Sequence, residues 1–324
     1  MDFNDTPQVA AFRAEARAWL DQNAVLKDPK KSERYGMFSE NESKEMVKQA
    51  QAWQAKKYDA GWACITWPKQ YGGRGGTVME NIIFSQEERR YETPPNVFGI
   101  GLGMAGPTIM YHGTEEQKKR HLPTMARGDI IWCQLFSEPS AGSDLAALRT
   151  RSERQGDEWV INGQKVWTSG AHYSKWGILV TRSDFNAPKH KGLTYFVVDM
   201  ESPGIEIRPI KQMTGGANFN EVFFTNVRIP DANRLDREGN GWAVAITTLM
   251  NERMSIGTGM GLTPDAAYTA LTALAKNCYV NGKPAIENGL VRSKIGEFYS
   301  RLKALELTGY RVLSKLSSGA APGT

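Results

Sequence analysis

Apolar residues recur at a helical period through the first 129 positions of the chain. They gather between Ala10 and Leu20, and Met46, Val47, Ala50 and Trp53 then repeat at the spacing of one helical turn. Such stripes are typical of amphipathic helices that bury one face. We therefore expect an N-terminal helical domain over residues 1–129.

Two helix starts in this region carry a reciprocal capping signal. Thr77 is followed three positions later by Glu80, and Thr114 is followed by Gln117. In each pair the hydroxyl and the longer polar side chain can satisfy backbone N–H groups that the first helical turn leaves unpaired. The glycine-rich segment 72–76 lies between the expected helices and predicts a loop.

The period changes to that of strands between residues 130 and 235. Short runs rich in β-branched and aromatic residues are punctuated by Gly, Asn, Asp and Pro. They comprise Ile130–Phe136, Glu158–Ile161, Gln164–Thr168, Trp176–Thr181, Leu193–Val198, Ile205–Pro209 and Glu221–Ile229. Asn162-Gly163 between two runs predicts a tight hairpin turn. Consecutive strands without intervening helices favour a central antiparallel β-domain, a sandwich or a barrel.

The helical period returns in residues 236–324, where we expect a C-terminal helical domain. An apolar stripe runs from Trp242 to Met250, Thr263-Pro264 has the form of a helix start, and 290–316 predicts a long helix. A long helix pair needs partners to bury its apolar face, so this bundle looks incomplete. The fold class predicted from the three regions together is α+β.

Composition narrows the function classes. The chain has 324 residues, of which 40 are Lys or Arg and 35 are Asp or Glu, and the small positive excess is dispersed, which argues against a nucleic-acid partner. No apolar run approaches the ~20 residues of a membrane span, and the N-terminus lacks a secretory signal pattern. Three scattered cysteines and four histidines without ligand spacing predict a reduced, cytoplasmic protein without a structural metal.

The segment 101–106 matches the Gly-x-Gly-x-x-Gly pattern of dinucleotide-binding proteins. That reading requires a preceding strand and a following βαβ unit, and the pattern predicts neither. Close helix packing is the favoured role of these glycines.

Three further places carry candidate chemistry. The strand-to-loop segment 132–144 combines Ser hydroxyls with exposed N–H groups that suit an anionic or heteroaromatic ligand, although an ordinary turn has the same composition. Trp167, beside two hydroxyl residues, can stack on a planar ring, or it can be a core residue. Glu252 and Arg253 lie about 100° apart on a helix, as a cleft carboxylate with a neighbouring cation or as a solvated pair.

Two of these segments carry a specific resemblance. The chain resembles the acyl-CoA dehydrogenase family in the segment Phe136-Ser137-Glu138-Pro139-Ser140-Ala141-Gly142-Ser143-Asp144. The resemblance continues in the later segment Asn162-Gly163-Gln164-Lys165-Val166-Trp167. The segment 249–253 also looks like the Leu-x-x-Glu-Arg stretch of that family. The likeness extends over nearly the whole chain, and we expect the last part of the usual C-terminal helical domain, with its Arg-x-x-Phe motif, to be lacking.

The resemblance implies FAD-dependent conversion of an acyl-CoA thioester to the trans-2-enoyl-CoA. A carboxylate removes the α-proton, and the β-hydrogen passes as hydride to flavin N5. Matched by position, Glu252 would be the base, as in relatives acting on long, branched or ring-bearing acyl groups. The residues expected at the cofactor are Gln134, Phe136, Ser137, Trp167 and Ser169. Those expected at the substrate are Ser143 and Arg253.

The resemblance also implies partners and alternatives. We expect a role in fatty-acid catabolism, an electron-transfer flavoprotein as acceptor, and a homo- or hetero-oligomer, either dimer or tetramer. One alternative is a non-catalytic subunit of a hetero-oligomer, which would have no reason to keep a carboxylate at Glu252. Another is an acyl-CoA oxidase-like flavoprotein, in which oxygen reoxidises the flavin.

Overall fold

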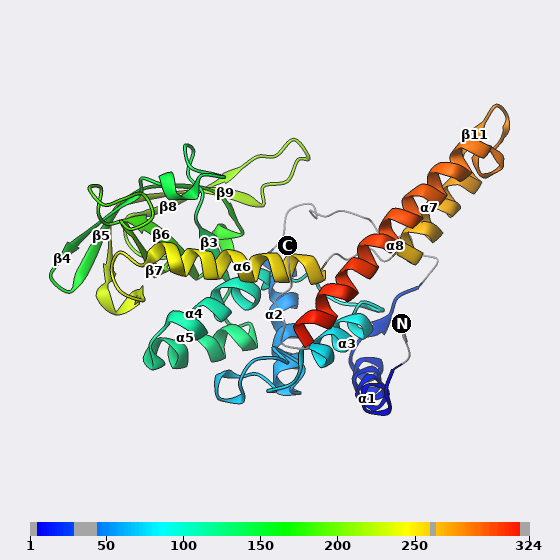
Figure 1. The fold of residues 1–324 in the computed structure, drawn as a ribbon, viewed down its shortest axis with the longest axis horizontal. Coiled ribbons are helices and arrows are strands. Elements are labelled where there is room, and N and C mark those ends of the chain that lie inside the picture. Colours follow the sequence, from blue (N-terminus) through cyan, green and yellow to red (C-terminus); the bar gives the residue numbers. More distant parts are fainter. Residues whose placement is uncertain (1–4, 29–43, 260–263, 318–324) are drawn as a thin grey trace. The chain divides into compact units, whose positions relative to one another are not determined.

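The computed structural model describes residues 5–28, 44–259 and 264–317. The chain divides into two compact units (Figure 1). The helical unit comprises residues 1–34, 77–92 and 256–324, and the sheet unit comprises residues 35–76 and 93–255. Each unit is described by itself.

The helical unit is built from helices that the apolar pattern predicts. They are α1 (Pro7–Asn23), α3 (Val78–Glu88), α7 (Pro264–Asn277) and α8 (Gly289–Ser317), with two short strand pairs, β1 (Val25–Leu26) with β2 (Tyr91–Glu92) and β11 (Tyr279–Val280) with β12 (Lys283–Pro284). The capping box of α3 is confirmed, because Thr77 Oγ1 accepts from the Glu80 N–H at 3.2 Å and Glu80 Oε2 accepts from the Thr77 N–H at 2.6 Å. Thr263 lies outside the described residues, and α7 begins at the predicted Pro264.

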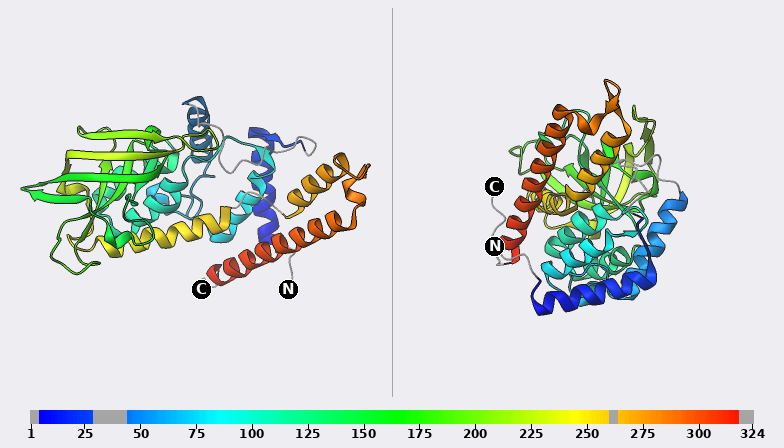
Figure 2. Two further views of the ribbon diagram at one scale, coloured as in Figure 1. Left: turned by 90° about the horizontal axis from the view of Figure 1, so that it is seen from above. Right: turned by 90° about the vertical axis from the view of Figure 1, so that its right-hand side faces the viewer.

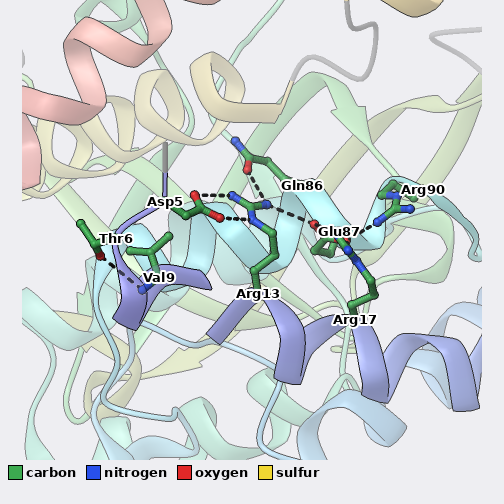
Figure 3. A network of polar contacts seen from close by, with 8 residues as sticks. All are labelled: Asp5, Thr6, Val9, Arg13, Arg17, Gln86, Glu87 and Arg90. Carbon is green, nitrogen blue, oxygen red and sulfur yellow. Dashed lines mark hydrogen bonds and ion pairs between the residues drawn. The ribbon is translucent and has the colours of Figure 1, made fainter. Parts of the chain in front are cut away.

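A buried carboxylate joins α1 to α3 within this unit. The Glu87 side chain is 4% exposed and forms ion pairs with Arg13 at 3.1 Å, Arg17 at 3.0 Å and Arg90 at 2.7 Å (Figure 3). Burial opposes its charge, but hydrogen bonds from Arg17, Arg90 and Arg13 lower the pKa of Glu87 to about 2. The carboxylate is therefore charged at neutral pH and ties both helices together.

The helices of the sheet unit are α2 (Lys44–Asp59), α4 (Gly106–His112), α5 (Glu115–Arg127) and the part of α6 (Gly241–Gly259) up to Ser255. The predicted capping box at Thr114 is confirmed, since Thr114 and Gln117 exchange side-chain-to-backbone hydrogen bonds at 3.3 and 2.9 Å. The Gly-x-Gly-x-x-Gly segment forms a π-helix, Gly101–Ala105, that leads into α4. A Cβ at Gly106 would approach the Trp67 ring to 2.4 Å and Met125 Sδ, on α5, to 3.1 Å, so this glycine permits close packing against a loop and a helix.

The sheet has eight strands in the described part of the chain. They are β3 (Trp132–Leu135), β4 (Arg151–Gln155), β5 (Glu158–Ser169), β6 (Trp176–Arg182), β7 (Leu193–Asp199), β8 (Ile205–Ile210), β9 (Phe219–Pro230) and β10 (Arg234–Leu235). Their order is β10-β7-β6-β4-β5-β9-β8, and β3 pairs with β6 in parallel. β4 also meets β6 in parallel, at the single residue pair Arg151 and Arg182, and the remaining strand pairings are antiparallel. The expected β-domain is therefore present, with parallel pairings at β6 that the pattern did not predict.

Helix α6 runs along this sheet, as Figures 1 and 2 show in yellow. Val244 and Ala245 of α6 are buried in one core with Ile109 of α4 and with Leu193 and Tyr195 of β7. This core fixes α6 against both the sheet and the helices before it.

Two details of the strand prediction are wrong. Asn162-Gly163 makes no hairpin and instead lies inside β5, which pairs along its length with β9. A Cβ at Gly163 would meet the Thr150 Cα at 2.7 Å, so the glycine permits a close approach of backbones. The strand Arg151–Gln155 was missed because its polar residues lack an apolar alternation. In residues 5–28, 44–259 and 264–317, the helices are too short or too polar to cross a bilayer.

Candidate active site on the sheet unit

The two motif segments lie side by side on the sheet. The Val166 N–H donates to the Ser137 carbonyl oxygen at 2.9 Å and joins the end of β3 to β5. Between Lys165 and Thr168 the pairing with β9 shifts, because three steps along β5 match two steps along β9. This segment, Lys165–Thr168, is called the Trp167 bulge below.

The bulge turns an aromatic ring toward the surface. Trp167 has φ of 60° and is 59% exposed, and its indole meets the ring of Phe219 edge to face at 6.1 Å. A large residue at positive φ is strained, and such strain is concentrated at functional sites. Ser169 is also exposed, whereas Thr168 Oγ1 is buried and has no hydrogen-bond partner within the described residues.

A buried ion pair supports this surface from below. Lys165 Nζ donates to Glu138 Oε1 at 2.9 Å and to the Phe136 carbonyl oxygen at 3.0 Å, and the two side chains are 0% and 5% exposed. Glu138 also accepts from the N–H groups of Arg149 at 2.7 Å and Thr150 at 2.9 Å. The ion pair thus anchors both ends of the loop 136–150.

The charges of this pair follow from its surroundings. Burial alone would raise the pKa of Glu138, but attraction to Lys165 and the hydrogen bonds hold it below its usual range. Burial lowers the pKa of Lys165 to about 8, against the opposing attraction of Glu138. At neutral pH the pair is a carboxylate and an ammonium ion.

The predicted base meets a predicted cofactor residue. Gln134 Nε2, on β3, donates to Glu252 Oε2, on α6, at 3.5 Å, and both side chains are partly buried. These residues are 118 positions apart in the chain. The fold therefore brings the Glu252 carboxylate, on α6, to Gln134 of β3, which lies three residues before Ser137.

The remaining predicted residues differ in how far they are exposed. The Phe136 ring is buried and meets the Tyr195 ring edge to face at 5.8 Å. Ser137 is partly exposed, and Ser143 is exposed on the loop that follows. Arg253 is exposed, and its Nη1 lies 3.5 Å from Met250 Sδ.

A cationic cavity of about 350 Å³ lies beyond Ser143 on the sheet unit. Its lining includes Arg149, Arg182, Phe185 and Lys189. Lys189 also forms an ion pair with Asp144, the neighbour of Ser143. Such a hollow suits a phosphate-bearing group with an aromatic ring.

Two buried groups escaped the sequence analysis. One is the Glu138–Lys165 pair, for which a cation in the middle of an apolar strand was the available signal. The other joins the hydroxyls of Thr108, Tyr195 and Thr248, which no local pattern connects.

Comparison with protein-family models decides the family. The acyl-CoA dehydrogenase N-terminal domain matches residues 6–129, the middle domain residues 133–227 and the C-terminal domain residues 239–324. The chain belongs to the acyl-CoA dehydrogenase family. The family and the fold class expected from the sequence are thereby confirmed.

Individual acyl-CoA dehydrogenases agree with this assignment. Acyl-CoA dehydrogenase FadE34 of Mycobacterium tuberculosis is 43% identical over 260 residues, which cover 80% of this chain and 33% of that protein. Acyl-CoA dehydrogenase IpdE1 of the same organism is 38% identical over 293 residues, covering 89% of this chain and 74% of the relative. The chain therefore spans about a third of one relative and about three quarters of the other.

Solved structures of acyl-CoA dehydrogenases share the fold. The Tcur3481-Tcur3483 steroid ACAD has a TM-score of 0.79 and 29% identity, covering 99% of this chain and 79% of that chain. The ChsE4-ChsE5 complex from Mycobacterium tuberculosis has a TM-score of 0.74 and 29% identity, covering 98% and 78%.

Acyl-CoA dehydrogenases are generally FAD-dependent, and the sheet unit fits a flavin. The exposed indole of Trp167 offers an aromatic face, and the strained bulge holds it outward. The exposed Ser169, two residues further along β5, adds a hydroxyl group. A planar heteroaromatic ring with polar edges matches this combination of groups.

Proposed function

We propose that the protein is an FAD-dependent acyl-CoA dehydrogenase in which Glu252 removes the α-proton of the thioester. The observation that carries the proposal is the 3.5 Å contact between Glu252 Oε2 and Gln134 Nε2. This contact joins the Glu252 carboxylate, on α6, to strand β3. Ser137, two residues after the end of β3, accepts a hydrogen bond from the Val166 N–H of the Trp167 bulge. Base and cofactor surface are then neighbours on one unit.

The cofactor surface consists of groups from β3 and β5. Trp167 would pack against the flavin ring, and the hydroxyls of Ser137 and Ser169 would donate to its polar edge. Gln134 would orient Glu252 through its amide, and the backbone at Phe136 would border the ring. When bound, FAD supplies the acceptor for the β-hydrogen, which leaves the acyl chain as hydride and yields the trans-2-enoyl-CoA.

The chain itself supplies the base. An α-proton beside a thioester is weakly acidic, so a carboxylate must be held within hydrogen-bond reach of that carbon. Glu252 is partly buried, which limits the water around its carboxylate. Gln134 Nε2 donates to one carboxylate oxygen, Oε2, and so would orient the carboxylate for this role.

The residues proposed to bind the substrate belong to the same unit. Ser143 and Arg253 would contact the CoA moiety, and the cavity with Arg149, Arg182 and Lys189 would receive phosphate groups. A base on this helix and the steroid ACAD among the solved structures favour a ring-bearing acyl group. An electron-transfer flavoprotein would be the acceptor and a second subunit, like or unlike, the partner. The cytoplasmic location stays a prediction.

The test is anaerobic reduction of FAD-loaded protein by a panel of straight-chain, branched and steroid-ring acyl-CoA thioesters. Bleaching of the flavin absorbance is expected with at least one thioester. Glu252→Gln should bind FAD normally but slow bleaching by about 10²- to 10⁴-fold, the usual contribution of a positioned base.

Glu221→Gln is the matched control. Glu221 Oε1 also accepts an amide hydrogen bond, from Gln164 at 2.9 Å, but on the β5–β9 face. This variant should bleach at the wild-type rate. Undiminished bleaching by Glu252→Gln rejects the base assignment, and protein that binds FAD but is reduced by no thioester is a non-catalytic subunit. Reoxidation by oxygen faster than by an electron-transfer flavoprotein would indicate an oxidase.

A further inference from the structure

A group of three buried hydroxyls fixes α6 one turn before the proposed base. Thr248 lies four residues before Glu252, and residues with this spacing share one face of a helix. Thr248 Oγ1 lies 3.0 Å from Thr108 Oγ1 and 2.9 Å from the Tyr195 hydroxyl. We call these three residues the hydroxyl junction.

The junction connects three elements that are distant in sequence. Thr108 belongs to α4, Tyr195 to β7 and Thr248 to α6, and all three residues are 0% exposed. Because the three residues are buried, the hydroxyls of Thr108 and Tyr195 depend on Thr248 between them and on nearby carbonyl groups. A shift or rotation of α6 would leave buried polar atoms unpaired, which is costly.

The hydrogens of the junction can be assigned so that every oxygen is satisfied. The Tyr195 hydroxyl donates to Thr248 Oγ1, and burial raises the pKa of Tyr195, so it keeps that hydrogen. Thr248 then donates to the Val244 carbonyl oxygen at 3.1 Å, or to Thr108 Oγ1. Thr108 donates to the Met104 carbonyl oxygen at 2.8 Å, in the π-helix before α4.

A second contact between α4 and α6 also restricts the movement of α6. His112, at the end of α4, has Nε2 2.9 Å from Thr247 Oγ1 and Nδ1 2.9 Å from Asp236 Oδ2. Thr247 and Thr248 thus join consecutive positions of α6 to two successive turns of α4. Two such contacts determine both the position of α6 along its own axis and its rotation about that axis.

We propose that Thr248 is a positioning residue, whose hydroxyl junction sets the rotation of α6 and so directs Glu252 toward Gln134. The inference rests on the proposed function, because it assigns Thr248 a role through the base. It also makes a claim about α6 itself, which is testable without catalysis.

The experiment compares Thr248→Val, Thr248→Ser and Thr181→Val in the full-length, FAD-loaded protein. Valine keeps the branched shape of threonine but removes the hydroxyl, and serine restores it. Thr181 on β6 is the matched control, since its buried Oγ1 donates to Ser152 Oγ at 2.8 Å and belongs to no part of the proposed site.

Thr248→Val should slow flavin reduction by about tenfold to a hundredfold, the effect of displacing a reacting group by about 1 Å. The apparent KM for acyl-CoA should change by less than about threefold, since the substrate contacts are retained. Thr248→Ser should recover most of the rate, and Thr181→Val should stay within about twofold of wild type. A merely stabilising hydroxyl would affect both valine variants alike.

Hydrogen–deuterium exchange gives the second measurement. Amides of residues 244–253 should exchange faster in Thr248→Val than in wild type, but not in Thr181→Val. Unchanged exchange along α6, or a wild-type reduction rate in Thr248→Val, overturns the inference. If Thr248→Val fails to fold, Tyr195→Phe removes one hydroxyl of the junction and decides by the same two measurements.

The two proposals fail in distinguishable ways. Protein that no acyl-CoA reduces contradicts the proposed function, whatever the exchange of α6. Normal reduction in wild type together with undisturbed exchange and rate in Thr248→Val contradicts the positioning role alone.

Discussion

Removal of the buried ammonium ion at Lys165 should destabilise the sheet unit strongly. Lys165→Met keeps a long apolar stem in the strand but leaves the Glu138 carboxylate without its counter-ion. The Phe136 carbonyl oxygen loses its donor at 3.0 Å as well. The loop that carries Ser137 would then be tied less firmly to β5.

The magnitude follows from burial and from the donors that remain. Breaking a buried ion pair by removing one partner costs about 3–5 kcal/mol. Glu138 keeps its hydrogen bonds from the Arg149 and Thr150 N–H groups, which places the loss at the lower end, about 3 kcal/mol. That free energy corresponds to roughly a hundredfold change in the unfolding equilibrium constant.

Urea unfolding followed by tryptophan fluorescence measures this loss, and a double-mutant cycle with Glu138→Gln isolates the pair. The double variant buries neither charge, so it should lose clearly less than the sum of the two single variants. The control is Arg228→Met. Arg228 pairs with Glu158 at 3.0 Å across β9 and β5, but the side chains are 58% and 43% exposed, so its loss should not exceed ~1 kcal/mol.

A free energy of unfolding for Lys165→Met within 1 kcal/mol of wild type would refute this reasoning. So would additive single and double variants, since additivity means that the two side chains do not interact. In that case the loop 136–150 must be held by its backbone hydrogen bonds.

Two further predictions concern Trp167 and Glu87. Trp167→Ala should weaken FAD binding by about tenfold without lowering the stability of the flavin-free protein, because the exposed indole stabilises little else. Titration of flavin fluorescence measures this, with Tyr279→Ala as an exposed aromatic control on the helical unit. The pKa of Glu87 is about 2 when folded and about 4.5 when unfolded, so its ion pairs stabilise the helical unit above pH ~4.5 and their contribution is lost as the pH falls toward 2. Glu87→Gln should remove this part of the acid sensitivity of hydrogen exchange in α1 and α3. The free energy of opening should change by at most ~3 kcal/mol, because Arg17 and Arg90 are half-exposed. Glu297→Gln on α8 is the control and should leave the acid sensitivity of α1 and α3 unchanged. Equal acid sensitivity of wild type and Glu87→Gln would contradict the assignment.

Local chemistry made much of the fold predictable. The capping boxes at Thr77 and Thr114 depend on atoms within one helical turn, and both form as expected. Asn162-Gly163 shows the limit of such signals. Its turn preference is local, but the pairing of β5 with the long strand β9 outweighs it.

The candidate site depends on contacts that local sequence does not encode. The resemblance to a family located Glu252 and Gln134, but their contact joins residues 118 positions apart. The outward direction of Trp167 arises from the register of β5 against β9, and the alternation of apolar residues carries no sign of it. The hydroxyls at Thr108, Tyr195 and Thr248 meet only because three elements pack together.

The Trp167 bulge has a consequence for insertions and deletions. Lys165 and Thr168 are three residues apart, yet both are buried, because the additional residue inverts the alternation of the strand. Deleting one of the two residues between them would place Thr168 two positions after Lys165, so an uninterrupted pleat would keep both side chains on the inner face and the pairing with β9 in register. The strand itself therefore does not require the additional residue, and what a deletion would remove is the outward position of the indole.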